Sequence, residues 1–468
     1  MCFHLNLDWD LPWFEIKSVS AYQGLDHRQK EDSSRSAYAL IGAYDDVAAW
    51  NTGLQNYNEE LDFLSHPGGS VDWVAGMFLL SQKSSQFVAE FQGTDPNPDL
   101  TIAPDIETAP PPNLGYGNYT FVRRKSYSPF VQATWHATED LRLTVGGRLN
   151  YDSYKLDSLN FSAFEIATVH NLYQDHAYTG RAEIDYDLAA DDMVYASLTR
   201  GYKPGGVNSV AGAAVVPNSF AVETNTAYEV GSKNRMLDDR LRANLAGFYY
   251  VYHNQQYIEA DPVPFDAGMA NIPSTHVWGV ESELSYLAFD DRLRLNANLT
   301  AERGAVQGGY KTIDSTLLNA IETSAAPCLN GGAYTNPACW AAVIASARNI
   351  GGNQPAKMPN WSGSANIAYA MPVAEGTLTP RIEYVFRGAL WSRLFAEPGL
   401  DRVKAYGLMN VNLLYQPGPG DYSLALTVTN LTDVAGVNSR YTDPYGTGQT
   451  SQEYVPPRQV MGTIAYSF

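Results

Sequence analysis

The sequence predicts an all-β protein in which antiparallel strands form a transmembrane barrel. Three observations support this fold class: apolar and polar residues alternate along many segments, short turns alternate with long polar connections, and aromatic residues are abundant, with 31 Tyr and 9 Trp. Successive side chains of a strand face opposite sides of a sheet, so alternation gives one apolar and one polar face. A soluble sandwich would also alternate. Many segments here, however, run to about ten residues or more, the length that a tilted membrane strand needs.

The first expected strand lies at the very start of the sequence. Phe3, Leu5, Leu7 and Trp9 alternate with polar residues, so the chain is expected to begin inside a strand. This segment has no basic region, no apolar region and no cleavage site of an export signal. We therefore expect a truncated gene product or a fragment, incomplete at its N-terminus.

The clearest strands lie in the middle of the chain. Residues 293–302 alternate Leu or Ala with Arg, Asn, Thr or Glu, and residues 141–152 and 181–188 repeat the pattern. In a transmembrane barrel the apolar face contacts lipid and the polar face lines the lumen. These segments are therefore expected to cross the membrane.

Connections of two kinds separate the expected strands. The short turns are Asp10–Pro12, Pro67–Ser70, Thr138–Asp140, Ala190–Asp192, Leu237–Asp239, Phe289–Asp291, Val373–Gly376 and Pro417–Gly420. The long polar segments lie near residues 30–50, 89–115, 158–173, 204–222, 260–273, 305–358, 393–402 and 433–456. Short periplasmic turns and long external loops are typical of transmembrane barrels, and this pattern implies about 17 strands, as eight hairpins and one final strand.

The strand number predicts how the two ends of the sheet relate. The last strand should end on the periplasmic side, so every odd strand, including the first, runs in the same direction. Bacterial barrels are antiparallel and even-numbered, so an odd number of strands would be missing, and five more would give the barrel of about 22 strands that carries a plug. The first and last strands of this chain should therefore stay apart or pair in parallel.

Composition and motifs exclude several classes of function. The formal net charge of −19 argues against a nucleic-acid surface, which needs basic residues. The sequence has no Gly-x-Ser-x-Gly turn, no His-Glu-x-x-His and no Cys-x-x-Cys, and its eight histidines are scattered. We therefore expect no enzyme activity, no cofactor and no metal site; an outer-membrane hydrolase is the weakest alternative.

Two cysteines lie in one long polar segment. Cys328 and Cys339 are spaced so that a disulfide would close a small loop, as in an oxidising compartment. Two unpaired thiols are the alternative. Metal binding is disfavoured, because the segment holds no histidine and only two sulfurs.

Several segments have a distinctive sequence. At the tail these are Asn430–Asp433, Pro456–Arg458 and the strand that ends on Phe468, and upstream they are residues 199–206, 223–233 and 279–283. The tail resembles the C-terminal box of the TonB-dependent outer-membrane receptors, and the three upstream segments resemble the mid-barrel sequences of that family. The similarity runs along essentially the whole chain.

The resemblance implies a function and a set of partners. Residues 1–468 would be the barrel domain of an outer-membrane receptor for TonB-energised uptake of a scarce ligand, most often an iron–siderophore complex. The TonB–ExbB–ExbD complex would act through a plug domain that is missing here, so this chain alone is not expected to transport. Cobalamin, oligosaccharides, aromatics and other metals remain possible cargoes, and a passive porin is the alternative class.

Four residues are singled out as functional candidates within this framework. Tyr466 and Phe468 end an apolar edge strand and, by resemblance, would be recognised by the barrel-assembly machinery; both would also serve as aromatic residues at the lipid interface. Tyr334 and Trp340, beside the expected disulfide, are the candidate ligand contacts in the external loops.

Overall fold

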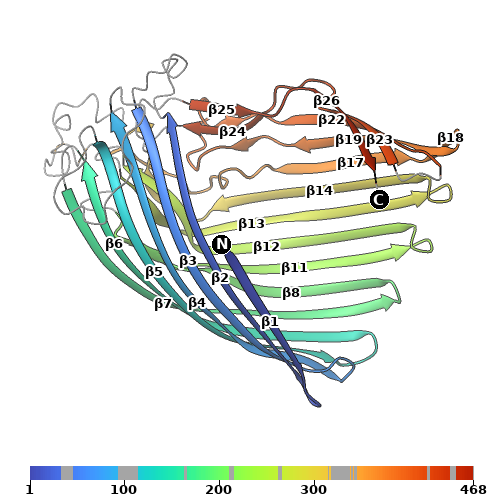
Figure 1. Cartoon of the computed structure of the whole chain (residues 1–468), viewed down its shortest axis with the longest axis horizontal. Coiled ribbons are helices and arrows are strands. Elements are labelled where there is room, and N and C mark those ends of the chain that lie inside the picture. The colour runs from blue at the N-terminus through green and yellow to red at the C-terminus, as the bar shows by residue number, and fades with distance from the viewer. Residues whose placement is uncertain are drawn as a thin grey trace.

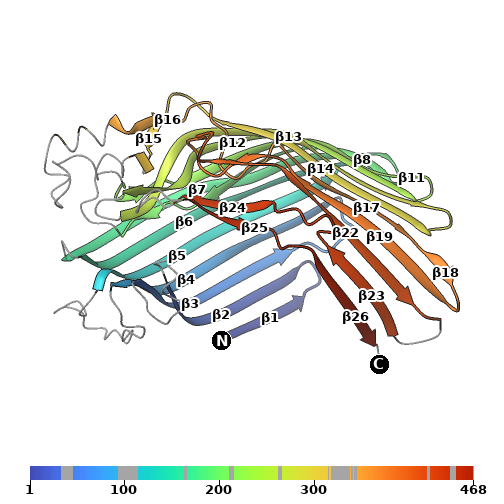
Figure 2. The same ribbon diagram turned by 90° about the horizontal axis from the view of Figure 1, so that it is seen from above.

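The computed structural model describes residues 1–32, 46–92, 114–162, 166–209, 216–261, 266–314, 316–317, 338, 341, 345–418, 422–442 and 450–466. These residues form one large curved antiparallel sheet and four small two-stranded sheets (Figures 1 and 2). The large sheet consists of β1 (Cys2–Asp10), β2 (Glu15–Asp32), β3 (Asp46–Leu64), β4 (Val71–Gln92), β5 (Leu114–His136), β6 (Leu141–Ser162), β7 (Ile166–Ala189), β8 (Asp192–Lys203), β11 (Glu223–Met236), β12 (Leu241–Asp261), β13 (Asp266–Ala288), β14 (Leu293–Val306), β17 (Trp361–Tyr369), β18 (Met371–Val373), β19 (Gly376–Arg387), β22 (Tyr406–Gln416), β23 (Tyr422–Thr429) and β26 (Gln459–Tyr466).

The small sheets lie within the long connections between strands of the large one. They pair β9 (Gly206–Val207) with β10 (Ser219–Phe220), β15 (Lys311–Ile313) with β16 (Ala347–Asn349), β20 (Leu390–Trp391) with β21 (Arg402–Val403), and β24 (Val437–Thr442) with β25 (Thr450–Tyr454). Within the described residues no helix is long and apolar enough to cross a membrane.

Each strand of the large sheet pairs with the next one along the chain. The short β18 continues β17 and shares its partner β19, so the sheet has 17 strands, as predicted. All of the neighbouring pairs are antiparallel, from β1 with β2 to β23 with β26. The predicted all-β antiparallel fold is therefore confirmed.

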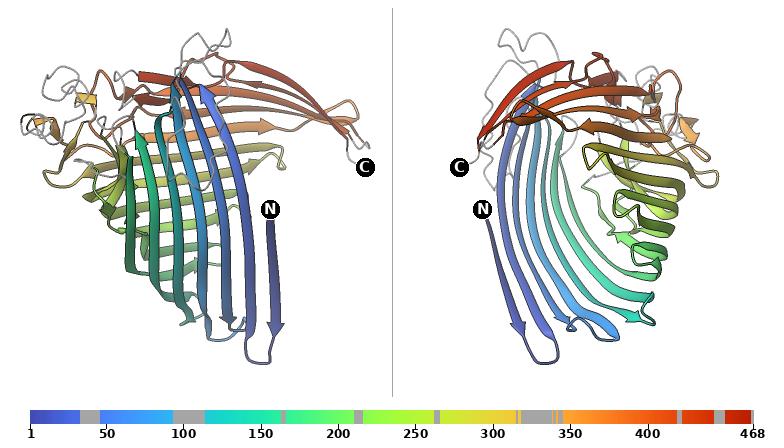
Figure 3. Two further views of the ribbon diagram at one scale, coloured as in Figure 1. Left: turned by 60° about the vertical axis from the view of Figure 1, so that its left-hand side comes forward. Right: turned by 90° about the vertical axis from the view of Figure 1, so that its right-hand side faces the viewer.

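The two end strands of this series run in the same direction. Because every pairing in a 17-strand series is antiparallel, β1 and β26 both run toward the short turns. Figure 3 shows them as the two ends of the curved sheet, and the described registers pair β1 only with β2 and β26 only with β23. This direction is incompatible with antiparallel pairing between the two end strands, as the strand count predicted.

Exposure distinguishes the two faces of the sheet. On β6, Val145 is 66% and Leu149 is 53% exposed, whereas Thr144 and Asn150 are buried. Side chains on the concave side of a curved sheet crowd one another, so the buried polar row marks the inner face and the exposed apolar row the outer face. The alternation read from the sequence thus corresponds to an apolar outer face and a polar inner wall.

Aromatic side chains form two bands on the outer face. The loop-side aromatic band, nearer the long connections, contains Tyr57, Tyr127, Tyr151, Tyr178, Tyr228 and Tyr249. The turn-side aromatic band contains Trp9, Trp73, Trp135, Tyr186, Tyr422 and Tyr466. All twelve side chains are exposed. Two such bands flank the lipid-facing surface of a transmembrane barrel, where amphipathic rings lie at the interfaces.

Within the described residues the short turns lie where the sequence predicts them, and the predicted turn Pro417–Gly420 extends outside these residues. Residues Leu237–Asp239 connect β11 to β12 with φ of 58°, 55° and 63°, and Phe289–Asp291 connect β13 to β14 with φ of 53°, 54° and 62°. Asp tolerates this left-handed conformation better than most residues, because its short side chain bonds locally. The matching conformations explain why both turns carry an Asp-Asp pair.

Two predicted loops are largely strand instead. Most of residues 158–173 belongs to β6 and β7, which end and begin at Ser162 and Ile166, and most of residues 260–273 belongs to β13. The strands continue beyond the loop-side aromatic band, where no lipid face is needed and polar residues occupy both faces. The start of a polar segment in the sequence therefore indicates the edge of the lipid-facing apolar surface, and the strand itself continues further.

The Asn430–Asp433 motif forms a turn that holds the start of the last strand. Asn430 has φ of 48°, accepts a hydrogen bond from the Val434 amide at 2.9 Å, and donates to the Pro456 carbonyl oxygen at 3.0 Å. Asp433 accepts a bond from the Arg458 amide at 2.8 Å. The two halves of the C-terminal motif are thus hydrogen-bonded to each other, which accounts for their joint presence.

Candidate functional site

The candidate site consists of the inner wall of the sheet and the connections at its long-loop end. On the inner wall, the buried carboxylate of Asp152 on β6 accepts a bond from Arg124 on β5 at 3.0 Å and one from the Tyr202 hydroxyl on β8 at 2.8 Å. A buried carboxylate needs such partners, because an unpaired charge away from water is costly. This triad links three strands and fixes the end of β8 against the wall.

Arginines on the inner wall are held by acids or by aromatic rings. Arg142 bonds both carboxylate oxygens of Asp187, at 2.5 and 2.8 Å. Arg148 lies over the rings of Phe78 and Phe130, with its guanidinium carbon 5.4 Å from each centroid. The bidentate pair and the stacked guanidinium are geometries that arginine favours. The wall thus presents charged groups in fixed positions.

The connection after β8 folds back onto this wall. Its short sheet of β9 and β10 lies against β6, β7 and β13. Asn208 donates to the Met269 carbonyl oxygen at 2.9 Å and accepts a bond from the Met269 amide at 2.8 Å, and Asn160 donates to the Ser209 carbonyl oxygen at 2.6 Å. A Cβ on Gly205 would lie 2.6 Å from the Phe220 carbonyl oxygen, so glycine is required there. This connection bridges β5–β6 and β13 on the inner side.

A second cluster joins two connections at the long-loop end. Its apolar part consists of Ile272, Val306 and Ile350, each at most 1% exposed, with four partly buried neighbours packed against them. These neighbours are Tyr257, Tyr310, Leu394 and Phe395. The residues come from β12, β13, β14 and the connections after β14 and β19. Apolar burial therefore fixes these connections against the strand ends.

Beside the apolar part lies an ion cluster of Asp314, Arg348, Arg393, Glu397 and Asp401. Arg393 donates from Nε to Asp401 at 2.6 Å and from Nη1 to Asp314 at 3.1 Å. Arg348 lies 3.4 Å from Asp314 and 3.0 Å from Glu397. Both aspartates are buried, so the two arginines supply their necessary counter-charge. We call this ion cluster and the apolar part together the loop platform.

A hydrogen-bonded group connects the loop platform to β12. Tyr257 donates to Glu259, and Thr312 donates to the same carboxylate at 2.5 Å and lies 2.7 Å from the Tyr257 hydroxyl. Burial, followed by the Glu259 carboxylate, raises the pKa of Tyr257. Tyr257 lies eight residues beyond Tyr249 of the loop-side aromatic band, on the same strand. Its phenol therefore stays protonated as a donor on the membrane-distal side of that band.

The structure describes only part of the predicted site. Tyr334, Trp340, Cys328, Cys339 and Phe468 lie outside the described residues. Tyr466 lies on β26 directly opposite Tyr422, is 64% exposed and belongs to the turn-side aromatic band. Among the described residues no three His, Cys, Asp or Glu side chains form a group that could hold a metal ion.

A sheet with an apolar outer face, two aromatic bands and a polar inner wall is the arrangement expected for the wall of a transmembrane barrel. The family model described as "TonB dependent receptor-like, beta-barrel" matches residues 3–431. The chain therefore belongs to the TonB-dependent receptor family, as its C-terminal and mid-barrel segments predicted.

Individual proteins of this kind resemble all or part of the chain. It is 28% identical over 159 residues to the ferric-pyoverdine 358 receptor of Pseudomonas putida, covering 33% of this chain and 19% of that receptor. The ferric yersiniabactin uptake receptor of Yersinia pestis has a similar structure, with a TM-score of 0.75, 16% identity, and coverage of 99% of this chain and 60% of that one. The structure of a copper transporter is also similar, with a TM-score of 0.68, 14% identity, and coverage of 100% of this chain and 65% of that one. The chain thus spans less than two thirds of these proteins' lengths.

Proposed function

We propose that this chain forms the barrel wall of an outer-membrane receptor that takes up an iron–siderophore complex by TonB-energised transport. The observation that carries the proposal is the identity with the ferric-pyoverdine receptor within a family match spanning residues 3–431. In an outer-membrane barrel of this kind the short turns would face the periplasm, and the loop platform would face the outside of the cell.

The geometry of the long-loop end supports a receptor. The loop platform holds the described parts of the connections after β14 and β19 in fixed positions, and the described part of the connection after β8 is bonded to the inner wall. An ordered rim loses little conformational entropy when a ligand binds. The inner wall below it offers charged and amide groups to a polar ligand, with the partly exposed Arg124, held by the buried Asp152, among them.

The partners and remaining sites form part of the same proposal. The TonB–ExbB–ExbD complex would act through a plug domain. Tyr466 and Phe468 would be recognised by the barrel-assembly machinery. Cys328 and Cys339 would form a disulfide that holds Tyr334 and Trp340 toward the ligand.

Uptake by cells tests this proposal. A strain lacking the gene and the same strain carrying it would be supplied with radiolabelled ferric siderophores, copper or labelled oligosaccharides, with and without a proton gradient. We expect the gene to restore gradient-dependent iron uptake alone. Restoration of copper or sugar uptake without iron uptake would contradict the siderophore assignment.

A passive porin is the alternative, and conductance distinguishes it. A porin lets small solutes through a planar bilayer without energy coupling, whereas a plugged receptor stays closed. Steady conductance by the protein purified from the outer membrane with all of its domains, together with gradient-independent uptake, would favour the porin.

A further inference from the structure

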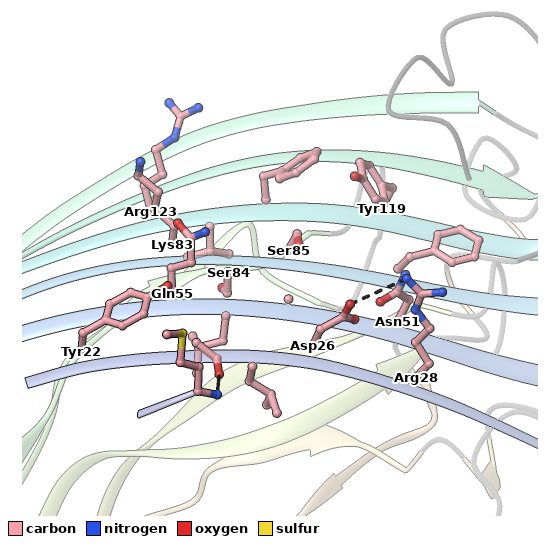
Figure 4. Close-up of a pocket in the computed structure, with 18 residues that line it drawn as sticks. Tyr22, Asp26, Arg28, Asn51, Gln55, Lys83, Ser84, Ser85, Tyr119 and Arg123 are labelled. Carbon is pink, nitrogen blue, oxygen red and sulfur yellow. Dashed lines mark hydrogen bonds and ion pairs between the residues drawn. The ribbon is translucent and has the colours of Figure 1, made fainter. Parts of the chain in front are cut away.

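Four cations gather on the outer face of three neighbouring strands. Lys83 on β4 lies directly opposite Arg123 on β5, and Arg123 lies directly opposite Lys155 on β6. Lys125 lies two residues along β5 on the same face, and all four side chains are exposed. Figure 4 shows Lys83 and Arg123 extending side by side from their strands. We call these four residues the cation row.

The cation row has one neighbouring acid among the described residues, Asp157, which lies near Lys155 and Arg123. Like charges directly opposite each other in a sheet are destabilising, and here three stand in register. Among the described residues, no carboxylate forms an ion pair with Lys83, Arg123 or Lys125, and Lys155 lies 3.9 Å from Asp157. Asp157 in turn bonds His170 at 2.9 Å. The row therefore has positive charge available for an anion.

The position of the cation row on the sheet indicates which kind of anion it would bind. Tyr127, two residues from Lys125 on the same face, lies opposite Tyr151 in the loop-side aromatic band. The row lies just beyond this band, on the side of the long connections. Aromatic bands mark the interface between hydrocarbon and head groups, so the row lies at head-group level on the outward-facing side.

The surface beside the row has room for a head group. A hollow of about 860 Å³ extends across β2 to β5, and Tyr22, Gln55, Ser85, Lys83 and Arg123 are among its lining residues (Figure 4). Hydroxyl and amide groups there can bond the sugar or glycerol portion of a lipid. Arg and Lys bind phosphate oxygens through charge-assisted hydrogen bonds.

We propose that the cation row binds the phosphate groups of lipid head groups in the outward-facing leaflet. This inference rests on the proposed placement of the barrel in the outer membrane. It adds a specific lipid site at the edge of a surface that contacts lipid through apolar and aromatic side chains.

Native mass spectrometry of the purified protein tests the site. The protein would be titrated with a phosphorylated membrane glycolipid, with the same lipid after removal of its phosphates, and with inorganic phosphate as competitor. The variant Lys83→Gln/Arg123→Gln removes two charges from the row. The matched control Arg235→Gln/Arg242→Gln removes two exposed, directly opposed arginines near the short turns between β11 and β12. The exchange Lys83→Arg/Arg123→Lys keeps the charge.

The expected result is preferential binding of the phosphorylated lipid by the unaltered protein. The row variant should bind it about 30-fold more weakly, since each of the two removed interfacial cations contributes about fivefold. The control and the charge-keeping exchange should bind within about threefold of the unaltered protein.

Three results would overturn the site. The row variant could bind the phosphorylated lipid as tightly as the unaltered protein does, the unaltered protein could bind the dephosphorylated lipid equally well, or millimolar inorganic phosphate could displace the bound lipid. Heat-dependent mobility of unboiled membrane protein on gels reports insertion separately. A chain that does not insert contradicts the proposed function, whereas an inserted chain with unchanged lipid binding contradicts the cation row alone.

Discussion

Nε of Arg393 lies 2.6 Å from Oδ1 of Asp401, whose side chain has no exposed surface. The same guanidinium reaches Asp314, which lies 79 residues away in the sequence. One arginine thus connects two long loops at a buried position. Loss of one partner from a buried ion pair costs about 3–5 kcal/mol, because the other charge is left without compensation.

Replacement Arg393→Met should therefore release the loop platform while the sheet remains intact. We expect rapid protease cleavage in the connections after β14 and β19, and unchanged heat-dependent gel mobility of the barrel. Arg402→Gln is the matched control, because Arg402 is exposed and lies over the Trp391 ring. Equal resistance of both variants to protease would show that the ion cluster does not hold the loops.

The C-terminal turn predicts a graded effect at Asn430. Asn430→Gly keeps access to the left-handed conformation but loses the hydrogen bonds to Val434 and Pro456, at about 1–3 kcal/mol for groups left unsatisfied. Asn430→Ala adds the strain of a positive φ. The free energy of unfolding, measured with urea in detergent, should be highest for the unaltered protein, lower for Asn430→Gly and lowest for Asn430→Ala. Alanine equal to the unaltered protein would refute the role of this turn.

Close packing on the inner wall predicts different outcomes at two glycines. A Cβ on Gly76 would lie 2.6 Å from the Leu61 carbonyl oxygen and 2.7 Å from the Phe130 ring, whereas Gly147 has nothing within 4 Å. Gly76→Ala should destabilise the barrel by about 1–3 kcal/mol through overpacking. Gly147→Ala, on the outer face, should be neutral or slightly stabilising in the same unfolding measurement. The reverse order would contradict the assignment of the two faces.

The inward-folded connection depends on Asn208. Its side chain is 5% exposed and bonds both the amide and the carbonyl of Met269. Asn208→Ala should speed amide hydrogen exchange at Met269 and at Val207. Asn218→Ala, an exposed position in the same connection, is the control and should leave exchange unchanged. Unchanged exchange in both variants would mean that other contacts hold this connection.

The sequence predicted the large sheet well, because its signals are local. Alternation at residues 141–152 depends on neighbours two residues apart, and a turn such as Leu237–Asp239 has its own composition. The face of each residue follows from the same period. The strand count and the direction of the last strand could therefore be derived without coordinates.

The loop platform could not be predicted in this way. Arg393 and Asp314 come from different connections, and neither lies in a periodic segment. Asn208 meets Met269 across 61 residues. Such contacts depend on where the strand ends bring the connections in space, and the candidates chosen from loop composition alone, Tyr334 and Trp340, lie outside the described residues. The cation row needed the registers of β4, β5 and β6, which alternation alone does not give.

The assignment of an outer lipid face and an inner wall is the central claim, and adjacent spin labels test it most directly. In a chain whose native cysteines Cys2, Cys328 and Cys339 are replaced by serine, single labels would be attached at Val145 and Thr144 after insertion into lipid vesicles. Relaxation by oxygen reports contact with lipid, and relaxation by a polar nickel chelate reports contact with water. The account predicts high oxygen and low chelate accessibility at 145, and the opposite at 144. Equal accessibility at the two positions, or the reversed pattern, would contradict it.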